Sequence, residues 1–505
     1  MNVLFIYSSD TDLLPGGLLE QQDCIPFGIS YIASFLQKHG HQAELIVLSR
    51  LFGRRNTTLL KEYIHRYEPK VICFTAVATQ YGFMRDTARY IRRLYPEIYL
   101  LIGGIHSTLN PQEVLSGDFD ALCIGEGERP VLELVSQLEN GQSPSGIPNM
   151  WIKHGSQVEK NPPREFLQDL DSLPFPERTM WQPWMARKLP ERCSVLLSRG
   201  CPFNCSYCSN HSLRKIAPGA YVRYRSPENI VAEIEEILIR FPTTKECYLE
   251  TETITFNADW CLALCLHLER FNRTIRRPMS FGANIRITPN VDLETIFASL
   301  KSCNFRFVNF GLESGSERVR REVLRRDYSN EEFIDAVKLA RKYGLQVAVF
   351  NLIGVPGETF VDFKETVRIN RICKPDWHFT GIYFPYPGTD LHSVCKKQGL
   401  LRRPLDQRRE RKKAVLDLPG FSKKQVQKSF KFFDYYVYRG FSTEDTVKIE
   451  LLTFVFKVYG FLIRLPFLRY VMRPVKKCGL NFRLVKAMKG SEKTNPVKNQ
   501  ERREK

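Results

Sequence analysis

Short apolar runs alternate with amphipathic segments along the first 160 residues of the chain. Val3–Tyr7 is typical of a buried strand, and Gly28–His39 carries apolar residues at helical spacing until Gly40 ends the helix. The same alternation predicts strands over 43–48, 71–75, 99–103 and 120–124, and helices over 59–67, 85–95, 111–115 and 130–138. This order predicts a doubly wound, Rossmann-like α/β fold, whose ligand would lie at the carboxyl ends of the parallel strands.

The alternation breaks between residues 155 and 190, where six prolines interrupt it as in a linker between domains. It then resumes with longer units. Strands are expected over 194–197, 246–249, 279–282, 306–310 and 346–352, and helices over 226–240, 260–271, 293–300 and 330–343. This order predicts a partial (β/α)6, TIM-like barrel, with its active groups at the carboxyl ends of the strands. We therefore expect an α/β domain over 1–154, a proline-rich linker over 155–190, a barrel over 191–395 and a basic C-terminal region over 396–505.

The chain has a formal net charge of +19, and the excess is confined to the C-terminal region. Residues from Lys396 onward hold 29 Lys or Arg and 10 Asp or Glu, so the preceding 395 residues are electrically balanced. This charge therefore bears on the partners of the C-terminal region and not on the chemistry of the core.

The C-terminal region predicts helices followed by a polar, disordered end after Lys489. Phe430–Tyr438 is rich in aromatic residues, and Ile449–Leu468 is strongly apolar, with Lys457 and Arg464 two helical turns apart on one face. No charge-free run approaches the ~20 residues that span a bilayer. Three uses fit this pattern: packing on the barrel, attachment to an anionic membrane surface, or contact with nucleic acid. We rank nucleic acid last, because the region shows no recognised RNA-binding fold.

Fourteen cysteines occur in the chain, which begins with a strand-like run and not with a basic, cleavable signal segment. We therefore expect reduced thiols and a cytoplasmic protein, located at the inner face of the membrane if the C-terminal region binds lipid. Cys261 and Cys265 lie four residues apart among leucines, as expected of a helix core.

Cys201, Cys205 and Cys208 form a C-x3-C-x2-C loop directly after the strand expected at 194–197. Thiolates are the soft ligands that iron–sulfur clusters require, and three of them on a [4Fe–4S] cluster leave one iron open to a further ligand. A zinc site lacking its fourth ligand and ordinary buried thiols are the alternatives. The spacing, with Tyr207 directly before the last cysteine, resembles the signature loop of the radical S-adenosylmethionine (SAM) enzymes.

Later segments resemble that family's motifs in the same order. Glu252 resembles an acid that accepts from the SAM ammonium group, although Thr251 stands where a preceding acid is usual. The segments 282–286 and 310–315 resemble motifs with an arginine and a glutamate, 352–358 resembles a turn beside the adenine, and 385–389 resembles the motif that closes the barrel. The resemblance implies the following SAM contacts: Tyr207, Glu252, Arg286, Glu313, Gly354 and Gly357.

Residues 26–28, residues 38–41 and two glycine-containing loops after strands follow one another in the first domain. With these segments the domain resembles the cobalamin-binding domain that precedes the barrel in cobalamin-dependent radical SAM enzymes. The resemblance implies cobalamin contacts at Gly103, Gly104, His106, Gly125 and Glu126. The Asp-x-His-x-x-Gly loop of many cobalamin proteins is absent, since Ser8–Gly17 contains no histidine. The lower axial ligand of cobalt is therefore not identified, and His106 either contacts the corrin or caps a helix. The rival hypothesis is a scaffold or carrier domain without corrin.

The resemblance implies an enzyme that cleaves SAM reductively to a 5′-deoxyadenosyl radical, with an electron donor of the flavodoxin or ferredoxin type. We expect methyl transfer to an unactivated carbon of a lipid-like or natural-product substrate. Ring formation, rearrangement or oxidation with the same cofactors is the main alternative. A radical enzyme that acts on RNA through its basic tail, with a degenerate corrin domain, is the other. The first domain lacks the second cysteine trio of the methylthiolating tRNA enzymes, which argues against that class.

Overall fold

The computed structural model describes residues 1–9, 25–50, 53–185, 190–288, 291–401, 405 and 410–439. The apolar run Ile449–Leu468, the end of the chain after Lys489 and most of the loop Ser8–Gly17 lie outside these residues. The chain divides into two compact units, Met1–Lys431 and Phe432–Lys505. The described part of the second unit contains one helix, α15 (Phe433–Tyr438).

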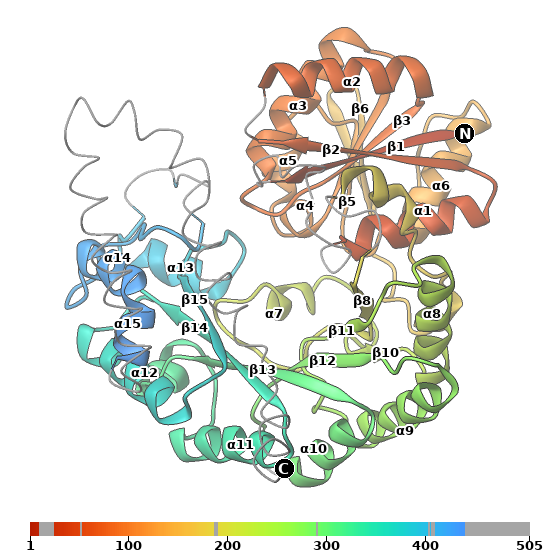
Figure 1. The fold of residues 1–505 in the computed structure, drawn as a ribbon. Coiled ribbons are helices and arrows are strands. Elements are labelled where there is room, and N and C mark those ends of the chain that lie inside the picture. The colour runs from red at the N-terminus through yellow and green to blue at the C-terminus, as the bar shows by residue number, and fades with distance from the viewer. Residues whose placement is uncertain are drawn as a thin grey trace, which may run out of the picture. The chain divides into compact units, whose positions relative to one another are not determined.

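The first sheet has seven strands in the order β2-β1-β3-β4-β5-β6-β7, of which the first five are parallel (Figure 1). The strand order reverses between β1 and β3, and sheets of this type bind ligands at that switch point. The five parallel strands are largely buried because helices cover both faces. Their bounds are β1 (Asn2–Ser9), β2 (Gln42–Ser49), β3 (Val71–Thr75), β4 (Tyr99–Gly103), β5 (Ala121–Cys123), β6 (Met150–His154) and β7 (Gln157–Lys160).

Helices α1 and α6 cover one face of this sheet, and α2, α3 and α5 cover the other (Figure 1). Each helix buries one apolar stripe, as Ile29, Ala33 and Leu36 do in α1. Their bounds are α1 (Phe27–Lys38), α2 (Gly53–Tyr67), α3 (Tyr81–Leu94), α4 (Ile105–Leu109), α5 (Pro111–Leu115) and α6 (Glu128–Glu139).

The proline-rich segment after β7 packs on the first domain through two tryptophans of a 3₁₀ helix (Thr179–Trp184). Trp181 Nε1 donates to Ser30 Oγ at 2.9 Å, and Trp184 Nε1 donates to the Leu45 carbonyl at 3.2 Å. A shorter 3₁₀ helix covers Leu170–Ser172. This segment is therefore anchored along the first domain before the chain enters the barrel.

The second sheet has six parallel strands in the order β15-β14-β13-β12-β11-β8, so each strand after β8 adds beside its predecessor. This is the topology of a partial (β/α)6 barrel, with β8 and β15 at its two edges. The strands are β8 (Arg192–Leu196), β11 (Glu246–Glu250), β12 (Ser280–Ile285), β13 (Phe305–Glu313), β14 (Gln346–Ile353) and β15 (Trp377–Ile382). A short antiparallel pair, β9 (Ser198–Arg199) and β10 (Arg223–Tyr224), follows β8.

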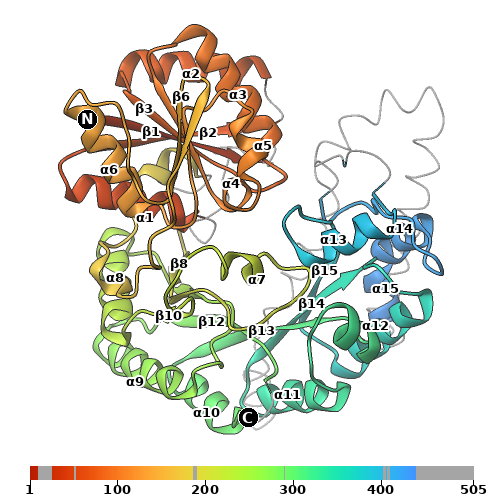
Figure 2. The same cartoon turned by 180° about the vertical axis from the view of Figure 1, so that it is seen from behind.

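The long helices of the barrel form its outer layer, whereas the short helix α7 (Asn210–Leu213) lies at the mouth of the barrel (Figure 2). Their starts carry the expected caps: Ser226 and Asn257 accept from backbone N–H groups, and Ser329 and Thr359 form capping boxes. The helices are α7 (Asn210–Leu213), α8 (Pro227–Arg240), α9 (Ala258–Thr274), α10 (Leu293–Ser302), α11 (Asn330–Lys342) and α12 (Phe360–Cys373), with one π-helical turn at Val319–Val323.

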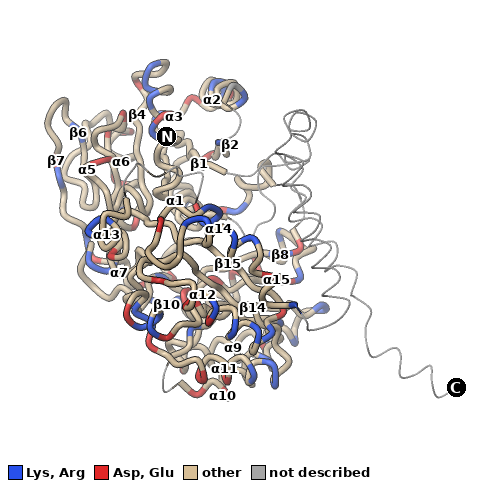
Figure 3. Tube along the Cα trace, turned by 90° about the vertical axis from the view of Figure 1, so that its left-hand side faces the viewer, with Lys and Arg blue, Asp and Glu red and all other residues tan. Residues whose placement is uncertain are grey.

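Helices α13 (Asp390–Lys397) and α14 (Lys423–Lys431) follow the barrel. Lys and Arg residues mark α14 in Figure 3, in line with the basic composition of this region. Among the described residues, no helix is both long and apolar enough to cross a bilayer.

The predicted fold class is confirmed: a doubly wound sheet is followed by a partial parallel barrel. Three features were not predicted. The antiparallel hairpin β6–β7 extends the first sheet to Lys160, the pair β9–β10 flanks the cysteine loop, and β15 supplies the sixth barrel strand.

Candidate active site

The cysteine loop connects β9 to α7 at the carboxyl end of β8. Arg214 Nη2 donates to the Cys201 carbonyl, and Ser206 Oγ donates to the Val323 carbonyl, each at 2.5 Å. Gly200 has a φ of +87°, and a Cβ there would lie 2.1 Å from the carbonyl oxygen of Tyr221. The loop therefore needs glycine at this position to pass so close to the strand that precedes α8.

The three cysteines of the loop are free thiols. Cys201 and Cys205 are buried, and Cys208 is partly exposed. Burial raises the pKa of Cys201 to about 12 and raises the pKa of Cys208 above its ordinary value, and the neighbouring thiols add to both shifts. The three sulfurs thus lie within electrostatic reach of one another, and metal binding would displace their protons.

The surroundings of the sulfurs fit a thiolate-bound cluster. Arg286 Nη1 lies 2.9 Å from Cys205 Sγ, and the backbone and side-chain nitrogens of Asn210 each donate to Cys208 Sγ at 3.5 Å. The Arg286 guanidinium also stacks 3.6 Å from the centre of the Phe203 ring, and its buried Nε has no partner. Such donors commonly surround the sulfurs of iron–sulfur sites.

The described residues contain no group of three or more Cys, His or acidic side chains compact enough for a single metal ion. A [4Fe–4S] cluster differs from a single metal ion in this respect, because it binds each thiolate through a different iron.

Tyr207 and Glu313, both predicted SAM contacts, meet at one arginine that the sequence did not single out. Arg326 Nη1 donates to Tyr207 Oη at 3.0 Å and to Glu313 Oε1 at 3.2 Å, and Arg326 Nη2 donates to the Gly311 carbonyl at 2.8 Å. Burial raises the pKa of Tyr207 well above its ordinary value, so its hydroxyl stays protonated. The cysteine loop is thereby tied to the end of β13.

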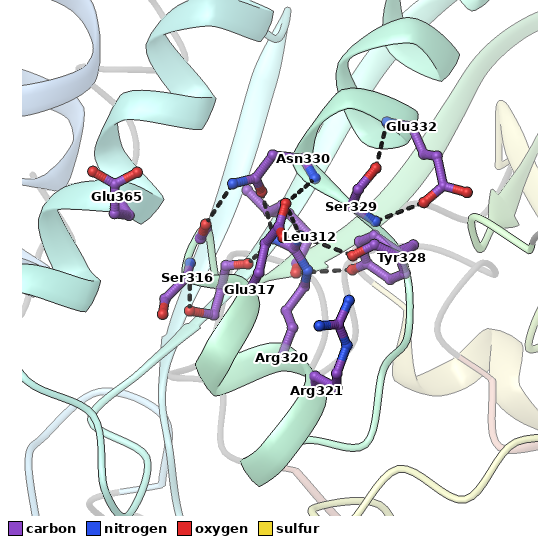
Figure 4. Close-up of polar contacts among 12 residues, drawn as sticks. Leu312, Ser316, Glu317, Arg320, Arg321, Tyr328, Ser329, Asn330, Glu332 and Glu365 are labelled. Carbon is purple, nitrogen blue, oxygen red and sulfur yellow. Dashed lines mark hydrogen bonds and ion pairs between the residues drawn. The ribbon is translucent and has the colours of Figure 1, made fainter.

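Glu313 has a left-handed backbone, with φ of +58°, beside a register shift in β13. A second buried arginine supports the segment that follows it (Figure 4). Arg320 Nη1 donates to the Ser314 carbonyl and to Asn330 Oδ1, both at 2.7 Å, and Nη2 donates to the Tyr328 carbonyl at 3.0 Å. The unusual conformation at Glu313 is therefore held by a network and not by local preference.

Glu252 lies at the carboxyl end of β11, facing the cysteine loop through Asn210. Asn210 Nδ2 donates to Glu252 Oε1 at 2.9 Å, and Tyr221 Oη donates to Asn210 Oδ1 at 2.6 Å. Thr251, the departure from the family pattern, shares a 2.8 Å hydrogen bond with Ser198 and is buried. Glu252 thus lies beside the cysteine loop, and its carboxylate can accept further hydrogen bonds in addition to the one from Asn210.

Gly354 and Gly357 lie in a turn at the carboxyl end of β14, with φ of +76° and +79°. The buried carboxyl group of Glu358 closes this turn by accepting from the N–H groups of Gly354 and Val355. Burial raises the pKa of Glu358 to about 8, although the two N–H donors oppose that shift. The two glycines therefore allow the turn, and Glu358, which belongs to the same segment 352–358, stabilises it through hydrogen bonds.

Polar side chains also line the inner face of the barrel strands. Tyr248 Oη donates to Asn284 Oδ1 at 2.6 Å and accepts from Asn309 Nδ2 at 3.1 Å. Glu250, two residues beyond Tyr248 and hence on the same side of β11, is half-buried. Burial, with the charge of Glu252 adding to it, raises the pKa of Glu250 to about 7.

A cavity of about 260 Å³ opens at the switch point of the first sheet. It is lined on one side by the strand ends and glycine loops of the first domain, and on the other by Leu196 and Arg199 of the barrel. Its walls include Gly103, Gly104 and Gly125, three of the predicted cobalamin contacts. Gly104 has a φ of +97°, and a Cβ there would lie 2.8 Å from the Ala76 carbonyl oxygen. The largely apolar walls and the close backbone fit part of a large planar ligand.

The other two predicted cobalamin contacts, His106 and Glu126, interact with protein groups. His106 is buried in α4, its ring centre 4.4 Å from that of Tyr81, and it does not line the cavity. Burial lowers the pKa of His106 to about 4, so its ring is neutral. Glu126 does border the cavity, but both of its carboxylate oxygens accept hydrogen bonds from protein donors.

Two family models match the chain: the B12 binding domain over residues 20–135 and the Radical SAM superfamily over residues 195–369. Together they cover more than half of the chain. These matches confirm the predicted cofactor set of a [4Fe–4S] cluster, SAM and cobalamin.

Individual relatives are distant but extend over most of the chain. An uncharacterized methyltransferase of Pyrococcus horikoshii is 26% identical over 87% of this chain and 92% of its own. An anaerobic magnesium-protoporphyrin IX monomethyl ester cyclase of Rubrivivax gelatinosus is 24% identical over 77% of this chain and 69% of its own. The fold is similar to that of the radical SAM methyltransferase TsrM from Kitasatospora setae, solved with cobalamin and a [4Fe–4S] cluster bound. That similarity has a TM-score of 0.63 at 18% identity and covers 80% of this chain and 76% of the other.

Proposed function

This chain belongs to the radical SAM enzymes that carry a B12-binding domain, and from that premise we propose that it methylates an unactivated carbon of a small substrate. We propose a lipid-like compound or natural product as the substrate class. When bound, the cluster and SAM supply a carbon-centred radical and cobalamin supplies a methyl group. An external electron donor of the flavodoxin or ferredoxin type completes the system.

The observation that carries this proposal is the shared boundary of the two sites. Leu196 and Arg199, which line the cavity of the first domain, lie directly before the loop with Cys201. A methyl donor in the cavity and a radical generated at the loop would therefore act on one substrate between them. Proximity of this kind is what a radical methyl transfer requires, because the substrate radical must meet the methyl group before other partners.

We assign the residues of the barrel as follows. Cys201, Cys205 and Cys208 hold the cluster. Glu252 and Glu313 present carboxylates to the ammonium group of SAM, and the turn at Gly354–Gly357 shapes the wall beside the nucleoside. The buried Arg326 orients Glu313 and the partly buried Tyr207, Asn210 orients Glu252, and the barrel excludes water from the radical.

Deletion of the gene, followed by comparison of metabolites and lipids by mass in cells fed methyl-deuterated methionine, tests the proposal. We expect loss of a product that is one CH₂ heavier than an accumulated precursor and that carries the label. A complementing gene with Cys201→Ala, Cys205→Ala and Cys208→Ala should not restore the product, while one with Cys261→Ala should. A lost product that differs only by two hydrogens, without label, contradicts methylation.

That second outcome would identify radical ring formation or oxidation, which the similarity to a cyclase keeps as the alternative. Both reactions need the same cluster loop and the same cavity. The label therefore decides between them, because only methyl transfer places it in the product.

A further inference from the structure

A compact network of ion pairs joins the first domain to the barrel at the rim of the cavity. Arg199 Nη1 donates to Glu126 Oε1 at 3.0 Å, and Arg199 Nη2 donates to Glu128 Oε1 at 2.5 Å. Arg223 Nη1 lies 2.9 Å and 3.0 Å from the two oxygens of Glu126. Two acids of the first domain thus face two arginines of the barrel.

The barrel presents these arginines as a pair. Arg199 and Arg223 are directly opposite each other in the antiparallel ladder of β9 and β10, so their side chains share one face. The tight passage at Gly200 fixes that ladder against the start of the cysteine loop. Movement of Arg199 would therefore carry Cys201, two residues later, with it.

The proline-rich segment after β7 takes part in the same network through Leu167. The Leu167 N–H donates to Glu126 Oε2 at 2.9 Å, and the Leu167 carbonyl accepts from Arg223 Nη1 at 2.9 Å. Arg199 also stacks 5.2 Å from the ring centre of Tyr31 in α1. The first domain, the proline-rich segment and the barrel are therefore all in contact with one another within this network.

The charges of the two acids and the two arginines stabilise one another in this network. Burial alone would raise the pKa of Glu126, but the charges of Arg199 and Arg223 outweigh burial and hold that pKa below its ordinary value. Arg199 is largely buried, with 15% of its side chain exposed, and its exchange for a neutral residue would leave Glu128 unpaired in a buried position. Guanidinium forks suit this role because each can serve two carboxylates at once.

We propose that Arg199 and Arg223 are positioning residues, which clamp Glu126 and Glu128 and so fix the cysteine loop relative to the cavity of the first domain. The inference rests on the proposed function, since it gives the clamp its purpose: to hold the radical source and the methyl donor at a set separation. It also assigns Glu126 to this clamp, and not to direct contact with cobalamin.

The consequence is a specific defect. When the clamp is broken, SAM cleavage and methyl transfer should become uncoupled, because each needs its own site while product formation needs both in register. The ratio of methylated product to 5′-deoxyadenosine then falls. A residue that merely stabilised the fold would lower the two amounts together.

The test uses Glu126→Gln and Arg199→Lys in the full chain, with Glu133→Gln as the matched control. Glu133 forms a two-pronged ion pair with Arg164, at 2.9 and 2.8 Å, in the same part of the chain, but contacts neither Arg199 nor Arg223. We expect faster hydrogen exchange at residues 196–201 and 125–128 in Glu126→Gln, and a product ratio reduced about tenfold. Arg199→Lys should behave in the same direction, because an ammonium cannot serve both acids. Glu133→Gln should match the parent in both measurements.

If Glu126→Gln does not fold, Glu126→Asp serves instead, since the shorter side chain keeps the charge but cannot reach both arginines. Unchanged exchange together with an unchanged ratio in any folded clamp variant overturns the proposal. Should no methylated product exist at all, the exchange measurement still tests the clamp by itself. Failure of the proposed function and failure of this inference are therefore distinguishable.

Discussion

Arg326 is the residue on which Tyr207 and Glu313, two of the predicted SAM contacts, depend. Replacing it with Lys keeps the charge but cannot satisfy Tyr207, Glu313 and the Gly311 carbonyl together. We expect Arg326→Lys to lower the free energy of unfolding by about 2 kcal/mol, since at least one buried group loses its partner. Urea unfolding of the apoprotein measures this.

Arg321→Lys is the control for that substitution. Arg321 lies on the π-helical turn Val319–Val323, five residues before Arg326, pairs at the surface with Asp327 and is 62% exposed (Figure 4). Its exchange should alter stability by less than about 0.5 kcal/mol. Equal losses in the two variants would show that Arg326 has no special structural role.

Glu250 gives the stability of the apoprotein a characteristic pH dependence. Its pKa is about 7 in the folded chain and 4.5 as a free side chain, so the folded state binds more protons between these values. Stability should therefore decrease as pH rises from 4.5 through 7, by up to about 3 kcal/mol from this group. Glu250→Gln should remove that part of the decrease between pH 5 and pH 8, as measured by urea unfolding. The surface variant Glu236→Gln should keep the full decrease, and an identical slope in Glu250→Gln would refute the assignment.

The residues that organise the site were the hardest to foresee. Arg199, Arg223 and Arg326 are three among 74 Lys and Arg residues, and each has a partner far away in the sequence: Glu128 is 71 positions from Arg199, Glu126 is 97 from Arg223 and Tyr207 is 119 from Arg326. No local pattern marks such residues. The cysteines were predictable because one short loop carries three ligands, whereas a clamp has no signature until the fold brings its members together.

At the scale of elements, the cysteine loop depends on one glycine. Gly200→Ala places a Cβ against the Tyr221 carbonyl, while Gly141→Ala meets no atom within 4 Å. Both glycines have positive φ, so both substitutions cost about 1–2 kcal/mol of backbone strain. The overlap at Gly200 should add about 1–3 kcal/mol and displace β10. Thermal unfolding of the two variants isolates that difference, and equal effects would contradict the close approach.

The strands and helices predicted from the sequence agree with the structure where an element is buried along its length. The five parallel strands of the first sheet are covered on both faces and therefore form uninterrupted apolar runs. The hairpin β6–β7 lies at the sheet edge, with six of its nine strand residues exposed or charged, and its pattern merges with the proline-rich segment that follows. The left-handed residue Glu313 could not be foreseen either, because its backbone conformation depends on contacts that form only in the fold, such as those of Arg326 to its side chain and of Arg320 to the Ser314 carbonyl.

For the molecule as a whole, the partner of the basic C-terminal region remains a prediction from the sequence. Its charge excess and the amphipathic run Ile449–Leu468 favour a membrane surface as partner. We expect the full chain to sediment with vesicles that contain anionic lipid at low salt and to be released at high salt. A chain ending at Arg439 should not sediment. Equal sedimentation of the two chains would contradict membrane attachment, and salt-sensitive nucleic acid in the purified full chain would indicate RNA instead.

We expect one chain to hold a SAM-cleaving cluster and a corrin at separate, adjoining sites. Anaerobic reconstitution with iron, sulfide and hydroxocobalamin, followed by SAM and a low-potential reductant, tests it most directly. We predict about four irons and one corrin per chain, with formation of 5′-deoxyadenosine. The variant with Cys201→Ala, Cys205→Ala and Cys208→Ala should retain the corrin but lose the iron and the nucleoside. SAM cleavage by that variant, or a parent chain that retains no corrin, would contradict the account.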